Sequence, residues 1–378
     1  PMHALVRTAH RCARPAAVAA RACAPHSVRY CAASEAAASA AALRPASEIP
    51  SPPEHPLVGA LFTTHKKYDT KAGHCTLRMH RDLYEQLGPI YRYNVAGFEQ
   101  VVVGSADGLN VFRAEGKYPM GLVRMLWMVH EVHRRTGLGD GGFLSDGEAW
   151  RDSRMALQPF MFTPRVAKSY AQPIRTAAAR CAAHFEQYAS TNRIEQFLER
   201  SAFDMFMGMA LDVPATGGLT EEPFALDYIT SAKKATAVAT LFAHKYLAGR
   251  DWLLDRVEVY KQFEDAHIDV AARSRQLIER ALRDKPDGHG IVHVMSRAGS
   301  DADKMLNSFT SLLLASVDTT SAFLHLVLLA LAREPRGAQA TLRAELRDVL
   351  SGNHYDPAAK LPYLKATVAE TARAFPFG

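Results

Sequence analysis

An acid and an alcohol stand side by side in the most apolar stretch of the chain, at Asp318 and Thr319. A carboxyl group next to a hydroxyl in an apolar groove can pass protons to a bound reactant. The Thr319 hydroxyl can also donate back to the carbonyl of Ala315, which is the common behaviour of a threonine inside a helix. The sequence leaves both interpretations open, a proton relay or a back-bonded threonine beside an aspartate on a wetter helix face.

A second cluster consists of Trp150 and Arg154, which are four residues apart and share one face of a predicted helix. An indole N–H and a guanidinium group on one face suit an anionic carboxylate. The alternative is a tryptophan packed at a helix edge and covered by the arginine, which is the commoner arrangement of an isolated pair.

A third cluster is Glu370 and Arg373, which are three residues apart and can pair on one helix face. An exposed pair of this kind stabilises a helix by only a few tenths of a kcal/mol. A buried pair would instead lock a junction between elements. A surface ion pair is the default interpretation.

Each cluster lies in a segment whose apolar residues recur with helical spacing. The longest predicted helix, Asp301–Arg333, would be about 50 Å long and carries Asp318 and Thr319 in its middle. Two predicted strands, Ile90–Val95 and Gln100–Val103, form a hairpin near the start of the chain. No regular alternation of strands and helices occurs, which argues against a parallel-sheet fold. The other predicted helices are Leu77–Leu87, Ala106–Glu115, Glu148–Met161, Arg165–Ala189, Arg193–Leu211, Glu222–Ala248, Trp252–Arg283, Arg336–Leu350 and Tyr363–Ala374.

The chain has 378 residues and a formal net charge of +6, most of which belongs to residues 1–47. This segment holds six arginines and one acid, Glu35, so the body is nearly neutral and a nucleic-acid-binding surface on it is excluded. Arg7, Arg11 and Arg14 follow helical spacing in an acid-poor stretch. Residues 1–47 are therefore predicted to be either an organellar transit peptide or a disordered low-complexity tail, and residues 48–378 one mainly α-helical domain.

Three of the five cysteines lie in the N-terminal segment, and Cys75 and Cys181 belong to the body. The chain has no C-x-x-C pair, so a reducing compartment is expected. His289 and His293 are four residues apart, but no thiol or carboxylate nearby completes a set of ligands. We therefore predict no metal ligand in this chain.

The three clusters occur together, in this order and at domain-scale separations. In this combination the sequence resembles the cytochrome P-450 family of haem-thiolate monooxygenases, and most of all its mitochondrial class. The resemblance runs from about Ser47 to Gly378. It implies a mainly α cytochrome P-450 fold with a small β-sheet near the start, and haem with its iron as the cofactor.

The resemblance also implies roles for the first two clusters. Trp150 and Arg154 would hold a haem propionate. Asp318 and Thr319 would deliver protons to dioxygen bound at the iron. Ala315 and Ser316 would line the same oxygen groove.

For the remaining residues the resemblance implies structural and partner roles. Glu370 and Arg373 would buttress the haem pocket, and Lys365 would face an iron–sulfur ferredoxin that supplies electrons. The loop from Lys117 to Ser145 and the helices from Glu222 to Arg283 would shape the pocket for a lipophilic small molecule such as a sterol. Mitochondrial location with peripheral contact to the inner membrane, through a patch such as Leu241-Phe242, is expected, a plastid being the less favoured alternative.

Three departures from the family pattern set further expectations. Ser316 stands where the family commonly has glycine, and Ala369 where the mitochondrial class commonly has a second lysine. The family's axial cysteine lies in a loop beyond the position of Gly378, so the fold is expected to be incomplete at its C-terminus and the chain an inactive fragment of a monooxygenase. The alternatives are a monooxygenase served by a flavoprotein reductase outside mitochondria, and a cofactor-free helical interaction module or pseudoenzyme.

Overall fold

The computed structural model describes residues 45–375 apart from 71–72, 75, 96–97, 107, 109, 111–126, 140–144, 162–163, 192, 213–226, 228, 232–248, 335 and 352–360. The chain divides into two units, Pro1–Glu48 and Ile49–Gly378. In the first unit the described residues contain one short 3-10 turn, η1 (Ala46–Glu48). The prediction of a leader at residues 1–47 falls almost entirely outside the described residues and stays a prediction.

The second unit begins with a small β-region. Strands β3 (Ile90–Val95) and β4 (Phe98–Val103) pair antiparallel, with Ile90 opposite Val103 and Val95 opposite Phe98. Alternate residues of β3, Tyr91, Tyr93 and Val95, are buried against helix α3 (Thr76–Leu87), as the period of two in a half-buried strand requires. The predicted hairpin is confirmed. The region also contains η2 (Leu61–His65), α2 (Lys66–Tyr68), β1 (Asp69–Thr70) and β2 (Gly73–His74).

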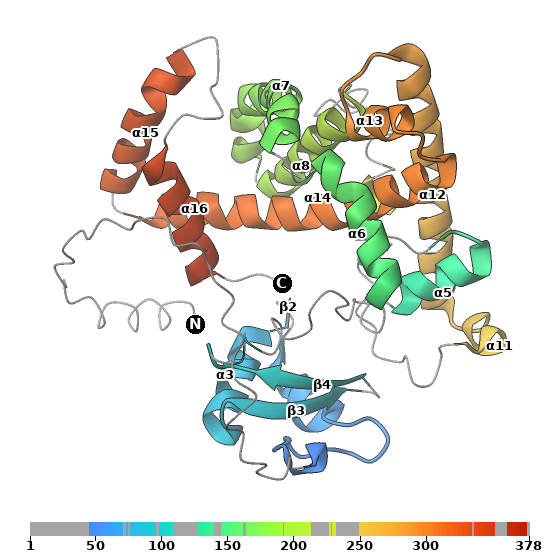
Figure 1. The fold of residues 1–378 in the computed structure, drawn as a ribbon. Helices are drawn as coiled ribbons and strands as arrows, with labels where there is room; N and C mark the ends of the chain where they lie inside the picture. The colour runs from blue at the N-terminus through green and yellow to red at the C-terminus, as the bar shows by residue number, and fades with distance from the viewer. Residues whose placement is uncertain are drawn as a thin grey trace, which may run out of the picture. The chain divides into compact units, whose positions relative to one another are not determined.

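The other regular elements in the described part of the second unit are helices (Figure 1). This confirms the mainly α fold with a small sheet near its start. They are α5 (Trp127–Thr136), α6 (Gly147–Met161), α7 (Pro164–Ser190), α8 (Ile194–Leu211), α11 (Asp251–Leu254), α12 (Glu258–Asp284), α13 (Ile291–Arg297), α14 (Ala302–Arg333), α15 (Arg336–Ser351) and α16 (Pro362–Ala374).

The N-terminal half of α14 is the centre of the main hydrophobic core. Phe309, Leu313 and Val317 are buried in a cluster that also contains residues of α8, α12 and α13. Most positions of α8, including Phe203 and Phe206, are buried, as expected of a helix that is apolar on nearly all sides. Asp301 caps α14 by accepting the Lys304 amide at 2.7 Å, which fixes where the helix begins.

By length and composition alone, α14 is also the one helix among the described residues that could cross a membrane. Its most apolar 18-residue window is only 17% buried. The helix nevertheless begins inside the protein core, where Leu313 is 0% exposed. We therefore interpret α14 as a core helix whose second half has an uncovered apolar surface.

One predicted helix is wrong in its continuity. The segment Trp252–Arg283 is interrupted at Asp255–Val257, between α11 and α12. The amides of Arg256 and Val257 bond three residues back rather than four, which ends α11. Leu254 is completely buried against α5, so a tertiary contact overrides the helical periodicity at this point.

Two described helices were not expected from the sequence. Helix α5 lies within the segment Lys117–Ser145 that we expected to be a loop. Its polar residues Glu131 and His133 are buried, so the segment looks hydrophilic in sequence although it lies inside the fold. Helix α13 is only seven residues long, which is too short for a clear periodic signal.

Two further predicted helices, Ala106–Glu115 and Glu222–Ala248, fall mostly outside the described residues, as does Leu241-Phe242 of the expected membrane patch.

The divided environment of α14 gives a stability prediction. Leu313→Ala should lower the free energy of unfolding by about 2–5 kcal/mol, because it opens a cavity in the core. Leu328→Ala, on the same helix but 37% exposed, should cost less than about 1 kcal/mol. Urea unfolding followed by circular dichroism measures both, and equal losses would contradict a buried first half and an uncovered second half.

Candidate functional site

Two hydroxyl groups in the middle of α14 hydrogen-bond back to their own helix. Thr319 Oγ1 donates to the Ala315 carbonyl at 2.7 Å, and Ser316 Oγ donates to the Leu313 carbonyl at 3.2 Å. Thr319 is exposed, whereas Ala315 and Ser316 are half-buried. The back-bonded alternative for Thr319 is therefore the one the structure shows, and the hydroxyl oxygen keeps a lone pair with which to accept a hydrogen bond.

Asp318 belongs to a different face of α14 from Thr319, since successive helical residues are turned by about 100°. The half-buried Asp318 lines a pocket of about 280 Å³ between α14 and α8. The pocket also contains two carboxylates from α8, Glu195 and Glu199, and His325 from α14. The acid and the alcohol are adjacent in sequence, but the structure does not bring them onto one surface.

Trp150 and Arg154 lie on the same side of helix α6 as the apolar residues that pack this helix against its neighbours. We call this row of side chains the α6 stripe. Trp150 is half-buried and Arg154 is exposed. Leu157 and Met161 continue this stripe at helical spacing, and both belong to a cluster shared with Met305 of α14. The stripe that carries Trp150 and Arg154 therefore leads into the contact with α14.

The corresponding stripe of α14 carries the two hydroxyl groups. Met305 and Leu312 belong to the cluster with α6. Ser316 and Thr319 follow Leu312 at intervals of four and seven residues, which places them on the same side of the helix. The stripes of α6 and α14 thus both extend from one packed cluster.

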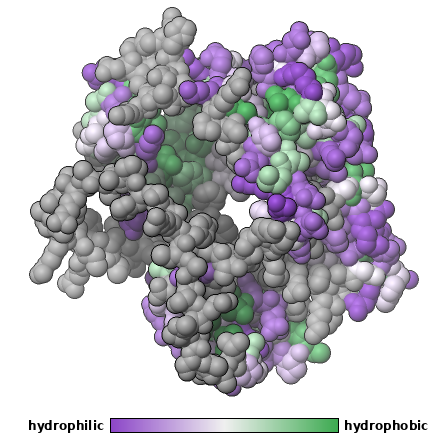
Figure 2. Space-filling model, viewed as in Figure 1, coloured by the Kyte–Doolittle hydropathy of each residue, from purple (hydrophilic) through white to green (hydrophobic). Residues whose placement is uncertain are grey.

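Many apolar side chains in the second half of α14 are only half-buried or are exposed, in contrast to those of its first half. Figure 2 shows a recessed apolar surface over this part of the helix. Monomeric proteins rarely expose large continuous apolar patches unless a ligand or partner covers them. Small side chains at Ala315 and Ser316 and the exposed guanidinium of Arg154 fit a flat apolar molecule that carries acidic groups.

Glu370 and Arg373 form a two-fold hydrogen-bonded ion pair on the surface of α16. Arg373 Nη2 and Nε donate to the Glu370 carboxylate at 2.6 and 2.7 Å. These hydrogen bonds hold the pKa of Glu370 below its usual value. The side chains are 64% and 72% exposed, so this is the default surface pair and contributes little to stability.

Helix α16 is instead held by a carboxylate from α15, which the sequence did not reveal. The two oxygens of Glu345 accept the amides of Tyr363 and Leu364, each at 2.8 Å. The N-cap residue of α16, Leu361, offers no side-chain cap, so Glu345 satisfies two amides of the first turn from outside the helix. The only indication in the sequence is that this helix begins with a proline and has no capping side chain of its own.

Lys365 is exposed on α16, where a partner protein could reach it. Glu370 lines a largely apolar cavity of about 420 Å³ between α16, α15 and the end of α14. The structure therefore places Lys365 and Glu370 on a helix that contacts α14. Among the described residues, no hydrogen bond or ion pair joins Glu370 or Arg373 to Trp150.

No group of three or more potential metal ligands occurs among the described residues. Cys181 is buried beside Tyr188 and Phe197, and burial raises the pKa of its thiol. A buried thiol with a raised pKa is a poor source of thiolate for a metal. Cys75 lies outside the described residues.

Comparison with known proteins places these features in context. The family model for cytochrome P450 matches residues 49–378. Cytochrome P450 11B2, mitochondrial, from Mesocricetus auratus is 27% identical over 323 residues, covering 80% of this chain and 63% of the relative. The 1,25-dihydroxyvitamin D(3) 24-hydroxylase, mitochondrial, from Rattus norvegicus is 25% identical over 350 residues, covering 88% and 66%. The chain thus spans just under two thirds of the length of these relatives.

The capping role of Glu345 can be tested without any ligand. Glu345→Ala should cost about 1–2 kcal/mol and speed hydrogen exchange of the first turn of α16, because two amides lose their acceptor. Arg343→Ala, an exposed position on the same helix α15, is the matched control and should leave that exchange unchanged. Equal exchange of α16 in both variants would refute the capping role.

Proposed function

This chain belongs to the cytochrome P450 family of monooxygenases, and we propose that it contributes most of a haem site that hydroxylates a lipophilic substrate. The observation that carries the proposal is the family match over residues 49–378. It is supported by the common apolar cluster of α6, the helix of Trp150 and Arg154, and α14, the helix of Thr319. The activity, substrate and partners of the whole protein are part of this proposal.

Haem fits the uncovered stripe in shape and charge. A porphyrin is flat and apolar, and Ala315 and Ser316 have side chains small enough to let it approach α14. Trp150 can donate its indole N–H and Arg154 its guanidinium to a propionate. When bound, haem would supply the iron that activates dioxygen for hydroxylation.

Of the two residues predicted to deliver protons, Thr319 is the one that would serve this groove. The Thr319 hydroxyl, held by the Ala315 carbonyl, would orient a water or pass a proton at Oγ1. Asp318 opens instead on the pocket with Glu195 and Glu199, so it would exchange protons on the far side of the helix. Ser316 in place of the usual glycine would narrow the groove.

A thiolate ligand for the iron is not supplied by the described residues. The one described cysteine, Cys181, is buried in an apolar cluster with Tyr188 and Phe197. We propose that Cys181 does not serve as the iron ligand, since burial in an apolar cluster raises the pKa of its thiol.

The names of the relatives suggest the substrate class and location. One relative is a mitochondrial hydroxylase of dihydroxyvitamin D(3), so we propose a sterol-like substrate. We also propose that residues 1–47 direct the protein to mitochondria, with peripheral contact to the inner membrane. Lys365 would then meet an iron–sulfur ferredoxin. The exposure of Glu370 and Arg373 gives no support to the buttressing role that the resemblance implies for them.

Haem titration tests the proposed cofactor site. The protein should bind one haem per chain, and Arg154→Leu should weaken binding by about 10-fold or more, because one charged hydrogen bond to a propionate is lost. Arg154→Lys keeps the charge and should restore part of the affinity. Since Arg154 is exposed, the folded stability of all three proteins should match. Equal haem affinities in all three would exclude the propionate role of Arg154.

The redox-partner role of Lys365 predicts a salt-dependent effect. Lys365→Glu should raise the Kd for a reduced iron–sulfur ferredoxin several-fold at low ionic strength, and the difference should shrink as salt screens the charges. Haem content should not change. Lys168→Glu, an exposed lysine on α7, is the control, and an equal effect of both variants would point to net charge rather than to a docking site.

A further inference from the structure

Helix α5 is packed on α12 and α11 through a compact apolar cluster. Trp127, Met128 and Val132 of α5 are buried against Phe263 of α12 and Leu254 of α11. The packing ties together two parts of the chain more than a hundred residues apart. Both parts belong to the segments expected from the sequence to shape the substrate pocket.

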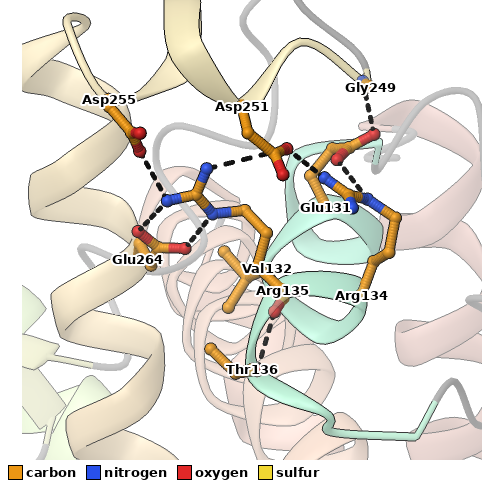
Figure 3. A network of polar contacts seen from close by, with 9 residues as sticks. All are labelled: Glu131, Val132, Arg134, Arg135, Thr136, Gly249, Asp251, Asp255 and Glu264. Carbon is orange, nitrogen blue, oxygen red and sulfur yellow. Dashed lines mark hydrogen bonds and ion pairs between the residues drawn. The ribbon is translucent and has the colours of Figure 1, made fainter.

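Two arginines of α5 form ion pairs at the solvent-facing edge of this interface, which we call its rim (Figure 3). Arg135 donates to Glu264 of α12 at 2.8 Å and to Asp255 at 2.6 Å. Arg134 bonds Glu131 at 2.9 Å and also pairs with Asp251 of α11.

Glu131 completes the arrangement at the rim. Its second carboxylate oxygen accepts the Gly249 amide at 2.9 Å. Every carboxylate drawn in the network therefore faces an arginine or an amide, and ion pairs of this kind remain formed between pH 5 and 8.

Beneath the ion pairs lie two histidines whose rings contact each other. The Nε2 atoms of His133 on α5 and His267 on α12 are 3.1 Å apart. The side chains are 5% and 0% exposed. Because both contacting atoms are ring nitrogens, one must donate and the other accept, so the pair needs one Nε2 without a proton.

A second proton has no favourable place at this contact. With both imidazoles protonated at Nε2, two N–H groups would point at each other. Nδ1 of His267 is buried and has no hydrogen-bond acceptor among the described residues. Burial, with a smaller contribution from His133, lowers the pKa of His267 to about 3. The neutral pair is therefore the form that the closed interface accepts.

The charged groups around the pair do not compensate for such a proton. On α5 these are Glu131, Arg134 and Arg135. On the facing side they are Asp251 of α11, Asp255 between α11 and α12, and Glu264 of α12, beside the neutral phenol of Tyr260, whose pKa is raised by burial. The carboxylates are already engaged by the arginines or by an amide. Helix α14 contributes the apolar Leu314, and the ring of Phe263 lies 5.6 Å from that of His267.

We propose that His133 and His267 form a proton-sensitive lock, which holds α5 on α12 while both imidazoles are neutral and releases α5 when the pair takes up a proton. The ion pairs of Arg134 and Arg135 fasten the rim in both conditions, and the buried pair sets the pH dependence. Release of α5 would open one wall of the substrate pocket. That consequence rests on the proposed function, whereas the lock itself does not.

The direction of the pH effect follows from linkage. A histidine whose pKa is lower in the closed state than its ordinary 6.5 binds a proton more readily once the interface opens. The closed state is then fully favoured above about pH 6.5 and loses stability as the pH falls below it, by about tenfold in the opening equilibrium per pH unit.

Hydrogen exchange of the haem-free chain tests the lock directly. Protection factors of α5, corrected for intrinsic exchange rates, should fall by about 30-fold between pH 8 and pH 5. Those of α8, which lies outside this interface, should change little. A fall confined to α5 and the facing residues of α12 supports the lock, and an equal fall in all helices, or none in α5, overturns it. Because no haem is needed, failure of the proposed function leaves this result interpretable.

Variants separate the histidine pair from the ion pairs. The double change His133→Gln with His267→Gln keeps polar groups in place without titration and should abolish the pH dependence of α5. His289→Gln, at an exposed position, should retain it. Arg135→Gln removes ion pairs at the edge of the interface but leaves both histidines in place. It should therefore lower the protection factors of α5 by the same factor at both pH values. A 30-fold fall that persists in the double variant, or one that disappears in Arg135→Gln, would assign the pH effect to other groups.

Discussion

One helix with two environments determines the arrangement of the site. The first half of α14 is buried against α8 and α12, where Phe309 and Leu313 are inaccessible to solvent. Burying each such side chain contributes about 1.5–3 kcal/mol, so the rotation of α14 about its axis is fixed by its core half. That rotation decides which residues of the second half face outward. Thr319 and Ser316 occupy the uncovered side because Leu313 and Val317 occupy the core.

The helices around α14 are held by independent contacts. Helix α6 is fixed by Leu157 and its neighbours, α16 by the carboxylate of Glu345, and α5 by the arginine network and the buried histidines. The exposed Glu370–Arg373 pair does not hold any of these junctions among the described residues. A change at one helix should therefore disturb the others little, since contacts without shared partners act nearly additively.

The sequence predicted those features that depend on local periodicity. The length of α14, the β3–β4 hairpin and the shared face of Trp150 and Arg154 all follow from spacing alone. The features that it missed depend on long-range contacts. His133 and His267 are 134 residues apart, and Glu345 caps a helix that begins 17 residues later, so neither role has a local signal.

Burial of polar residues explains the other misses. Glu131 and His133 made α5 look like a surface loop, although both lie inside the fold. For Thr319 the sequence correctly offered back-bonding to Ala315, but no pattern could show that Asp318 opens on a separate pocket beside α8. Which face a residue occupies depends on how the whole helix is packed.

The central claim is that the stripes of α6 and α14 cover one haem. A crystal structure of the haem-loaded protein tests it most directly. The account predicts a porphyrin lying against Ala315 and Ser316, with a propionate within hydrogen-bond distance of Arg154 and Trp150. A porphyrin bound elsewhere, or an Arg154 side chain turned away from a ring that does lie on α14, would contradict it.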